Sequence, residues 1–174
     1  QSRIFVGSTM ELFGDWIKPA WMHEIFGMVK SEPWHTFQFL TKQPQNLVKF
    51  SPFPENCWVG VSTTDFDALA KADLYLSKVK ATIKFISAEP LLSGLIGSLG
   101  APVDYLLKDS TANWLIIGAM TGPQAKRPAF SWVKQWTEAA DKYGIPVFHK
   151  DNLIKLMGDG DFPKRQEFPK VIGG

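Results

Sequence analysis

A hydroxyl group and a carboxylate follow directly after a short, mostly apolar run in the middle of this sequence. Residues 83–86 have the pattern of a buried strand, and Ser87 and Glu89 come immediately after them. A carboxylate at the end of a strand can bind an amine, hold a ribose or act as a general base. Its alternative role is a salt bridge to a neighbouring lysine. We predict Glu89 to be catalytic, because Pro90 restricts its backbone to extended geometry and so directs the side chain.

Two lysines occupy the same kind of position. Lys42 follows the apolar run 36–40, and Lys150 follows residues 146–148. A desolvated lysine can form a Schiff base, whereas a solvated one binds carboxylate or phosphate or balances nearby acids. Nothing in the local sequence indicates desolvation, so anion binding is the favoured role. Because side chains alternate along a strand, His149 and Lys150 face opposite sides, and we predict that Lys150 points inward.

Hydroxyl-rich turns follow two further apolar runs. The first turn contains Ser8, Thr9 and Glu11, and the second contains Ser62, Thr63 and Asp65. These side chains can hydrogen-bond the sugar or amino acid part of a ligand. They can equally cap the helix that follows, and for Asp65 we expect capping at least as much as binding.

Composition and charge exclude several classes of protein. The net charge of +2 is too small to indicate nucleic acid or an anionic membrane as a partner, and only short basic pairs such as Lys126–Arg127 favour nucleic acid. No apolar stretch is long enough to predict a transmembrane helix. Cys57 is the single cysteine, and neither His23 nor His35 lies at metal-ligand spacing from it. We therefore predict a cytoplasmic protein with a buried structural thiol and no metal site.

The chemistry-bearing residues require elements that bring them together. Apolar runs begin near residues 4, 36, 58, 83, 114 and 146, roughly 20 to 30 residues apart, which is the size of a strand, a crossover helix and the next strand. Between these runs the period changes to helical. The expected helices are listed by their core positions: Ile17, Trp21, Ile25, Met28 and Val29; Leu47 and Val48 within 44–50; Leu69, Ala72, Leu76 and Val79; and Trp132, Val133, Trp136, Ala140 and Tyr143 between Pro128 and Gly144.

This alternation predicts an α/β fold with a parallel sheet. Polar groups at every strand end favour a barrel over an open doubly wound sheet, because a barrel's active site draws on many strand ends. Six strands do not complete an eight-stranded barrel, so we predict an incomplete (β/α) barrel. One domain spans residues 1–174, with an irregular C-terminal segment from 155 to 174. Since the chain opens at Gln1 without Met, we expect its natural beginning to be absent.

Several stretches together resemble the phage-associated, radical-SAM-like protein family, whose substrate is generally unassigned. The similar stretches are residues 3–13, 35–42, 56–62, 85–92, 145–152 and 165–169, in that order along the chain. Ser8 and Glu11 match the family's Ser-x-x-Asp position, with Glu in place of Asp. Thr41 and Lys42 match its Leu-Thr-Lys motif, and Ser87 and Glu89 match fully. Residues 118–123, Gly-Ala-Met-Thr-Gly-Pro, depart from the family's Gly-Gly-Glu-Ser-Gly-Pro.

The resemblance implies a partial barrel that binds S-adenosylmethionine and a [4Fe–4S] cluster. Three cysteines preceding residue 3 would hold the cluster, which reduces S-adenosylmethionine to a 5′-deoxyadenosyl radical. We predict cofactor contacts from Ser8, Glu11, Ser62, Thr63, Ser87 and Glu89. We predict substrate contacts from Thr41, Lys42, Lys150, Asn152 and Arg165, with Lys42, Glu89 and Lys150 catalytic.

Two other functions compete with this interpretation. One is a cluster-free lyase or aldolase that uses Lys42 or Lys150 as a Schiff base. The other is a non-catalytic module that binds nucleic acid or protein in a phage setting. With only Cys57 available for a cluster, the chain as it stands is predicted to lack radical activity.

Overall fold

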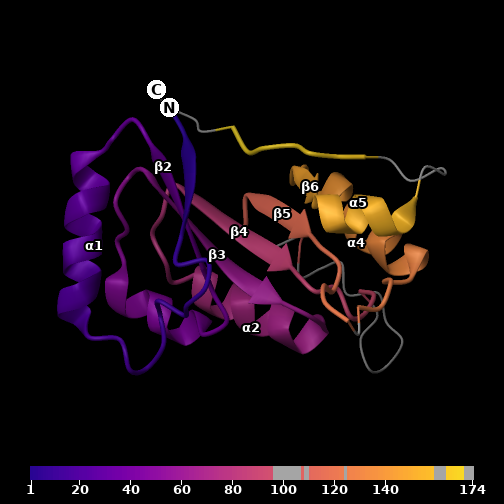
Figure 1. Ribbon diagram of the computed structural model, residues 1–174, viewed down its shortest axis with the longest axis horizontal. Helices are drawn as coiled ribbons and strands as arrows, with labels where there is room; N and C mark the ends of the chain where they lie inside the picture. The colour runs from indigo at the N-terminus through magenta and orange to yellow at the C-terminus, as the bar shows by residue number, and fades with distance from the viewer. Residues whose placement is uncertain (96–106, 108–109, 124, 159–163, 171–174) are drawn as a thin grey trace.

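The computed structural model describes residues 1–95, 107, 110–123, 125–158 and 164–170. Within this part of the chain, six parallel strands form one curled sheet in sequence order (Figure 1). They are β1 (Arg3–Val6), β2 (Thr36–Thr41), β3 (Cys57–Thr63), β4 (Ile83–Ala88), β5 (Trp114–Ile117) and β6 (Val147–His149). The sheet is an incomplete parallel barrel, as the sequence predicts.

Helices connect the strands and cover the outer face of the sheet. They are α1 (Pro19–Ser31), the 3₁₀ helix η1 (Pro44–Phe50), α2 (Phe66–Leu76), α4 (Phe130–Lys142) and α5 (Asp151–Met157). In Figure 1, α1 lies beside β1 and β2, and α4 and α5 lie beside β5 and β6. Among the described residues, none of the helices combines the length and apolarity needed to cross a bilayer.

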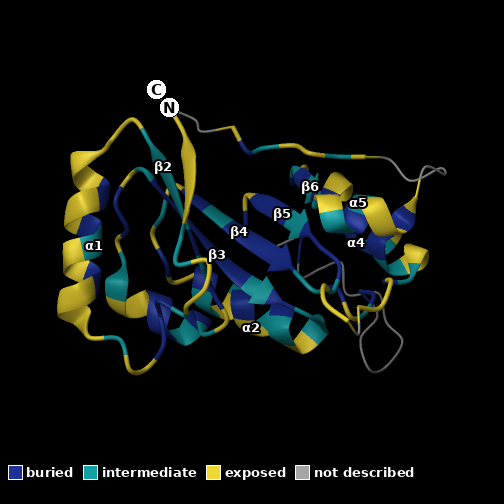
Figure 2. Ribbon diagram, viewed as in Figure 1, coloured by how far each residue is buried: buried dark blue, intermediate teal, exposed yellow. Residues whose placement is uncertain are grey.

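The alternation of side chains along each strand separates an outer from an inner face. On β3, Val59 and Val61 point outward into the core under the helices, whereas Trp58 points inward. Phe85 of β4 and Trp114 of β5 join Trp58 in a smaller inner cluster. The central strands are therefore buried on both faces, as Figure 2 shows, while β1 at the edge stays exposed.

Helix α1 buries a different stripe from the one predicted. Met22, Phe26 and Val29 are buried, whereas Trp21 and Met28 are 48% and 63% exposed. The helix is apolar around most of its circumference, so its periodicity alone fits two neighbouring stripes. Ring packing selects one of them, because Phe26 makes edge contacts within 6 Å of core phenylalanines of β2 and of the loop before β3.

The other helices follow their predicted positions with one exception. Leu47 of η1 is fully buried, but Val48 is 38% exposed. Asp65 caps α2 by accepting a hydrogen bond from the Ala68 amide. Gly144 ends α4 with φ +68°, a conformation that glycine adopts without the steric cost of a Cβ.

The C-terminal region differs from the predicted irregular segment at its start. Helix α5 continues to Met157, past the predicted boundary at residue 155. Residues 164–170, which we call the strap, then run alongside β6, with an antiparallel bridge between Phe148 and Gln166. Figure 1 shows the strap passing back toward β1. Residues 159–163 and 171–174 of the predicted segment lie outside the described part of the chain.

Candidate functional site

Two cavities adjoin at the C-terminal ends of the strands. The mouth cavity, about 300 Å³ in volume, lies at the ends of β1 to β3 and is lined by Ser8, Thr9, Glu11, Thr41, Lys42 and Ser62, among others. The inner cavity, about 290 Å³, lies inside the sheet and is lined by Arg3, Gln38, Ser87, Glu89, Lys150 and several aromatic rings. Phe5 and Leu40 line both cavities.

The mouth cavity and the inner cavity are smaller than two others in the structure. Cavities of about 700 and 750 Å³ lie at the opposite end of the sheet, where Thr82 lines both. In parallel barrels the reacting groups come from the C-terminal ends of the strands, and the opposite end serves stability. The two smaller cavities therefore form the candidate site.

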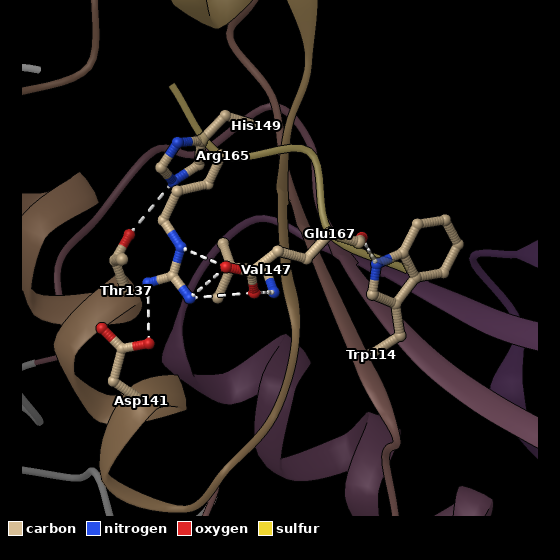
Figure 3. A network of polar contacts seen from close by, with 7 residues as sticks. All are labelled: Trp114, Thr137, Asp141, Val147, His149, Arg165 and Glu167. Atoms are coloured by element: carbon tan, nitrogen blue, oxygen red, sulfur yellow. Dashed lines mark hydrogen bonds and ion pairs between the residues drawn. The ribbon is translucent and has the colours of Figure 1, made fainter. Parts of the chain in front are cut away.

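Glu89 and Lys150 form an ion pair at the rim of the inner cavity. The Lys150 Nζ lies 2.8 Å from the Glu89 Oε2, and the two side chains are 43% and 25% exposed, respectively. Lys150 points inward as predicted, while His149 is buried on the outer face beside the Thr137 hydroxyl, at 3.1 Å (Figure 3). The rim therefore presents an acid and a base that together carry no net charge.

Glu11 connects the turn after β1 to the end of β2. Its carboxylate accepts hydrogen bonds from the Phe13 amide, the Thr41 hydroxyl and the Lys42 amide at 3.0, 2.7 and 2.8 Å. Thr41 therefore serves to hold Glu11. These three bonds hold the turn after β1 against the end of β2, beside the mouth cavity. Lys42, whose amide makes one of the bonds, also lines this cavity.

The serine and threonine candidates divide between the two faces. Ser62 faces the mouth cavity and donates its hydroxyl to the Glu89 carbonyl at 3.1 Å. Ser87 faces the inner cavity and is 2% exposed. Thr63 was predicted to contact a cofactor, and this placement is wrong. It follows Ser62 on the same strand, so it faces the opposite side, where it is 1% exposed.

Asn152 and Arg165 lie outside both cavities. Asn152 bonds both the amide and the carbonyl of Ala119 and so ties α5 to the end of β5. Arg165 forms ion pairs with Asp141 at 2.7 Å and Glu167 at 2.8 Å (Figure 3). Their predicted substrate contacts are not supported, because each side chain is held by structural partners.

Several residues of the inner cavity were not predicted from the sequence, among them Arg3, Gln38, Trp114 and Phe168. Gln38 had a detectable signal, because it alternates with Phe37 and Phe39 and so had to face inward on a strand of this sheet. Phe168 had none, since it reaches the cavity from the strap.

Within the described ranges, no group of three or more His, Cys, Asp or Glu side chains is arranged to hold a metal ion. Cys57 begins β3 on the outer face, fully buried, and desolvation raises the pKa of its thiol to about 12. A cluster needs three thiolates, and Cys57 is the single cysteine of the chain. A [4Fe–4S] cluster therefore does not fit the residues present.

The comparisons with known proteins give a family without an assigned activity. A family model described as Protein of unknown function (DUF5131) matches residues 1–154. No match is found among the curated proteins or the solved structures. The matched range includes both members of the rim ion pair and ends before the strap.

Proposed function

We propose that this chain, which belongs to the DUF5131 family, binds S-adenosylmethionine at the C-terminal mouth of its barrel. It would form the barrel core of an enzyme of the radical S-adenosylmethionine type. The observation that carries the proposal is the ion pair between Glu89 and Lys150 at the rim. A carboxylate beside an ammonium is complementary to the zwitterionic amino acid group of this cofactor. In that group an ammonium and a carboxylate are attached to the same carbon.

The ion pair can exchange its internal partner for the ligand. Glu89 would accept hydrogen bonds from the ammonium group, and Lys150 would donate to the carboxylate. Both side chains are part-exposed, so opening the pair costs little, since solvent-exposed pairs contribute only about 0–1 kcal/mol. Ser8 and Ser62 line the adjoining mouth cavity and are the candidates for hydrogen bonds to the ribose.

The proposal for these residues stops at binding. A [4Fe–4S] cluster supplies the electron that cleaves S-adenosylmethionine reductively, and this chain contributes no set of thiolates to hold one. The residues present therefore orient the cofactor's amino acid and ribose groups, and no radical step is assigned to them.

The lysine-dependent alternative has less support. A Schiff-base lysine needs desolvation or a cationic neighbour to become nucleophilic. Lys150 is 43% exposed and paired with a carboxylate, and Lys42 is exposed. An exposed lysine side chain is suited to binding anions. Borohydride with candidate carbonyl substrates would trap a covalent adduct only under the lyase alternative.

Calorimetric titration with S-adenosylmethionine and 5′-methylthioadenosine tests the proposal. The second compound keeps the adenosine group and lacks the amino acid part. We expect the wild-type protein to bind S-adenosylmethionine at least about tenfold more tightly, since two charge-assisted hydrogen bonds are lost with the amino acid. Glu89→Gln and Lys150→Met should each remove most of this preference.

Lys155→Met is the matched control, because Lys155 is an exposed lysine of α5 outside both cavities. It should bind both compounds like the wild-type protein. The proposal fails if the wild-type protein does not bind S-adenosylmethionine, or if the rim variants keep the full preference.

A further inference from the structure

Aromatic rings form the floor of the inner cavity. Trp114 lies with its ring centroid 5.5 Å from Phe85, 5.9 Å from Phe148 and 5.3 Å from Phe168. Phe148 and Phe168 are themselves 5.2 Å apart. Such a floor offers ring faces and edges to a flat ligand, and stacking on aromatic side chains stabilises a bound planar ring.

Two polar side chains face this floor without an intramolecular partner. Neither the Gln38 amide nor the Ser87 hydroxyl forms a side-chain hydrogen bond within the described residues, although both line the cavity. An amide offers N–H donors and a carbonyl acceptor side by side, and a hydroxyl offers both. A half-buried polar group that lacks a protein partner points to a ligand or to water as its partner.

Each charged side chain that lines the cavity already has an intramolecular partner. Glu89 and Lys150 neutralise each other at the rim. The Arg3 guanidinium stacks over the Phe168 ring, 3.6 Å from its centroid, and so covers the floor from the β1 side. A neutral ring can therefore occupy the cavity while these pairings stay in place.

We propose that the inner cavity binds a neutral, planar heteroaromatic ring with hydrogen-bond donors and acceptors on its edge, the chemistry of a nucleobase. The ring stacks on Trp114 and Phe168, and the Gln38 amide bonds its polar edge. A volume of about 290 Å³ lies at the lower end for ligand pockets and suits one base or nucleoside. This site requires no S-adenosylmethionine, so it stands or falls separately from the proposed cofactor.

The strap completes this site from outside the family-matched residues 1–154. Glu167 anchors it, because its backbone carbonyl accepts the Trp114 indole N–H at 2.8 Å and its carboxylate accepts the Val147 amide at 3.0 Å (Figure 3). These bonds fix the neighbouring Phe168 against the floor. The strap is therefore a wall of the base site as well as a cover for the edge of β6.

Calorimetric titration of the whole chain with free bases tests the proposal in the absence of S-adenosylmethionine. The bases tested are adenine, hypoxanthine, cytosine and uracil. The first two are compared with unsubstituted purine and the last two with unsubstituted pyrimidine. Each base is also compared with its nucleoside. We expect at least one base or nucleoside to bind with a dissociation constant below about 1 mM. The matching unsubstituted ring should bind roughly tenfold more weakly, since it lacks the exocyclic amino and carbonyl groups.

Two variants separate the two contributions to affinity, which are hydrogen bonds to the ligand's polar edge and stacking on the face of its ring. Gln38→Leu removes the amide at similar volume, so the preference for the base over its unsubstituted ring should fall to about one. Phe168→Ala removes part of the floor, so both compounds should weaken by a similar factor, about tenfold. Phe130→Ala, an exposed phenylalanine at the start of α4, should change neither affinity.

The proposal is overturned if no base or nucleoside binds the wild-type protein, or if Gln38→Leu keeps the full preference. Circular dichroism of each variant checks that the fold is intact. Because no cofactor is present in this titration, its failure leaves the S-adenosylmethionine proposal untouched. Failure of that proposal likewise leaves base binding open to this test.

Discussion

Single glycines set the shape of the inner face at two positions. A Cβ on Gly60 of β3 would lie 2.2 Å from the Phe85 ring, and a Cβ on Gly118 would lie 2.9 Å from the Glu89 carboxylate. Only glycine, which lacks a Cβ, allows contacts this close. Gly60 leaves room for the Phe85 ring in the floor of the inner cavity, and Gly118 leaves room for the Glu89 side chain at the rim.

Gly60→Ala should lower the free energy of unfolding by about 1–3 kcal/mol, because the Phe85 ring must move from a packed position. Urea denaturation measures the change. Gly27→Ala is the matched control, since a Cβ there meets nothing within 4 Å, and it should stabilise α1 by about 0.5–1 kcal/mol.

The Gly60→Ala substitution in a Phe85→Leu background tests the cause. The smaller side chain relieves the clash, so the second substitution should cost less there than in the wild-type protein. Equal costs in both backgrounds would show that the ring is not the obstacle.

The docking of the strap depends partly on charge. Arg165 pairs with Glu167 and Asp141, and its hydrogen bond to Glu167 holds the pKa of that carboxyl below its ordinary value. A carboxyl with a lowered pKa contributes stability above its unfolded pKa, and this contribution is lost as the pH falls through the folded pKa. The docked strap should therefore loosen in acid.

The Trp114 indole N–H reports this loosening, because it donates to the Glu167 carbonyl. We expect its NMR signal to shift as the pH falls below about 4.5, the ordinary pKa of glutamate. In Glu167→Gln this acid-dependent shift should disappear. Glu138→Gln, which changes an exposed carboxylate of α4, should leave the shift as it is in the wild-type protein. A shift that persists in Glu167→Gln would assign the transition to another group.

On the scale of the whole molecule, the sheet separates two apolar clusters with different tasks. The larger cluster packs the helices on the outer face, and it contains Cys57. The smaller one forms the floor of the inner cavity and includes Trp58, Phe85 and Trp114. Interiors at native packing density admit reagents only when the structure opens.

Cys57 should therefore report the opening of the outer core. Burial raises its pKa to about 12, so at pH 8 almost no thiolate is present in the folded protein. We expect a disulfide reagent to label Cys57 at the rate of unfolding, and at once in concentrated urea. Rapid labelling of the folded protein would contradict this buried position.

The sequence determined the sheet because each strand carries its own local signal. Apolar runs such as 83–86, separated by helical periods, allow a parallel sheet and little else. Strand alternation also determined that Lys150 and His149 face opposite sides, and the same rule, applied to β3, would have placed Thr63 on the outer face.

Only the tertiary structure decided which polar groups meet. Glu89 and Lys150 are 61 residues apart in sequence, and their contact depends on the curl of the sheet. The stripe of α1 depended on ring packing against Phe39, and the strap's path depended on Trp114 and Asp141, partners distant in the chain. Periodicity indicates which face of a single helix or strand is apolar. Contacts between elements depend instead on how those elements are placed relative to one another, and the sequence of one segment does not specify this.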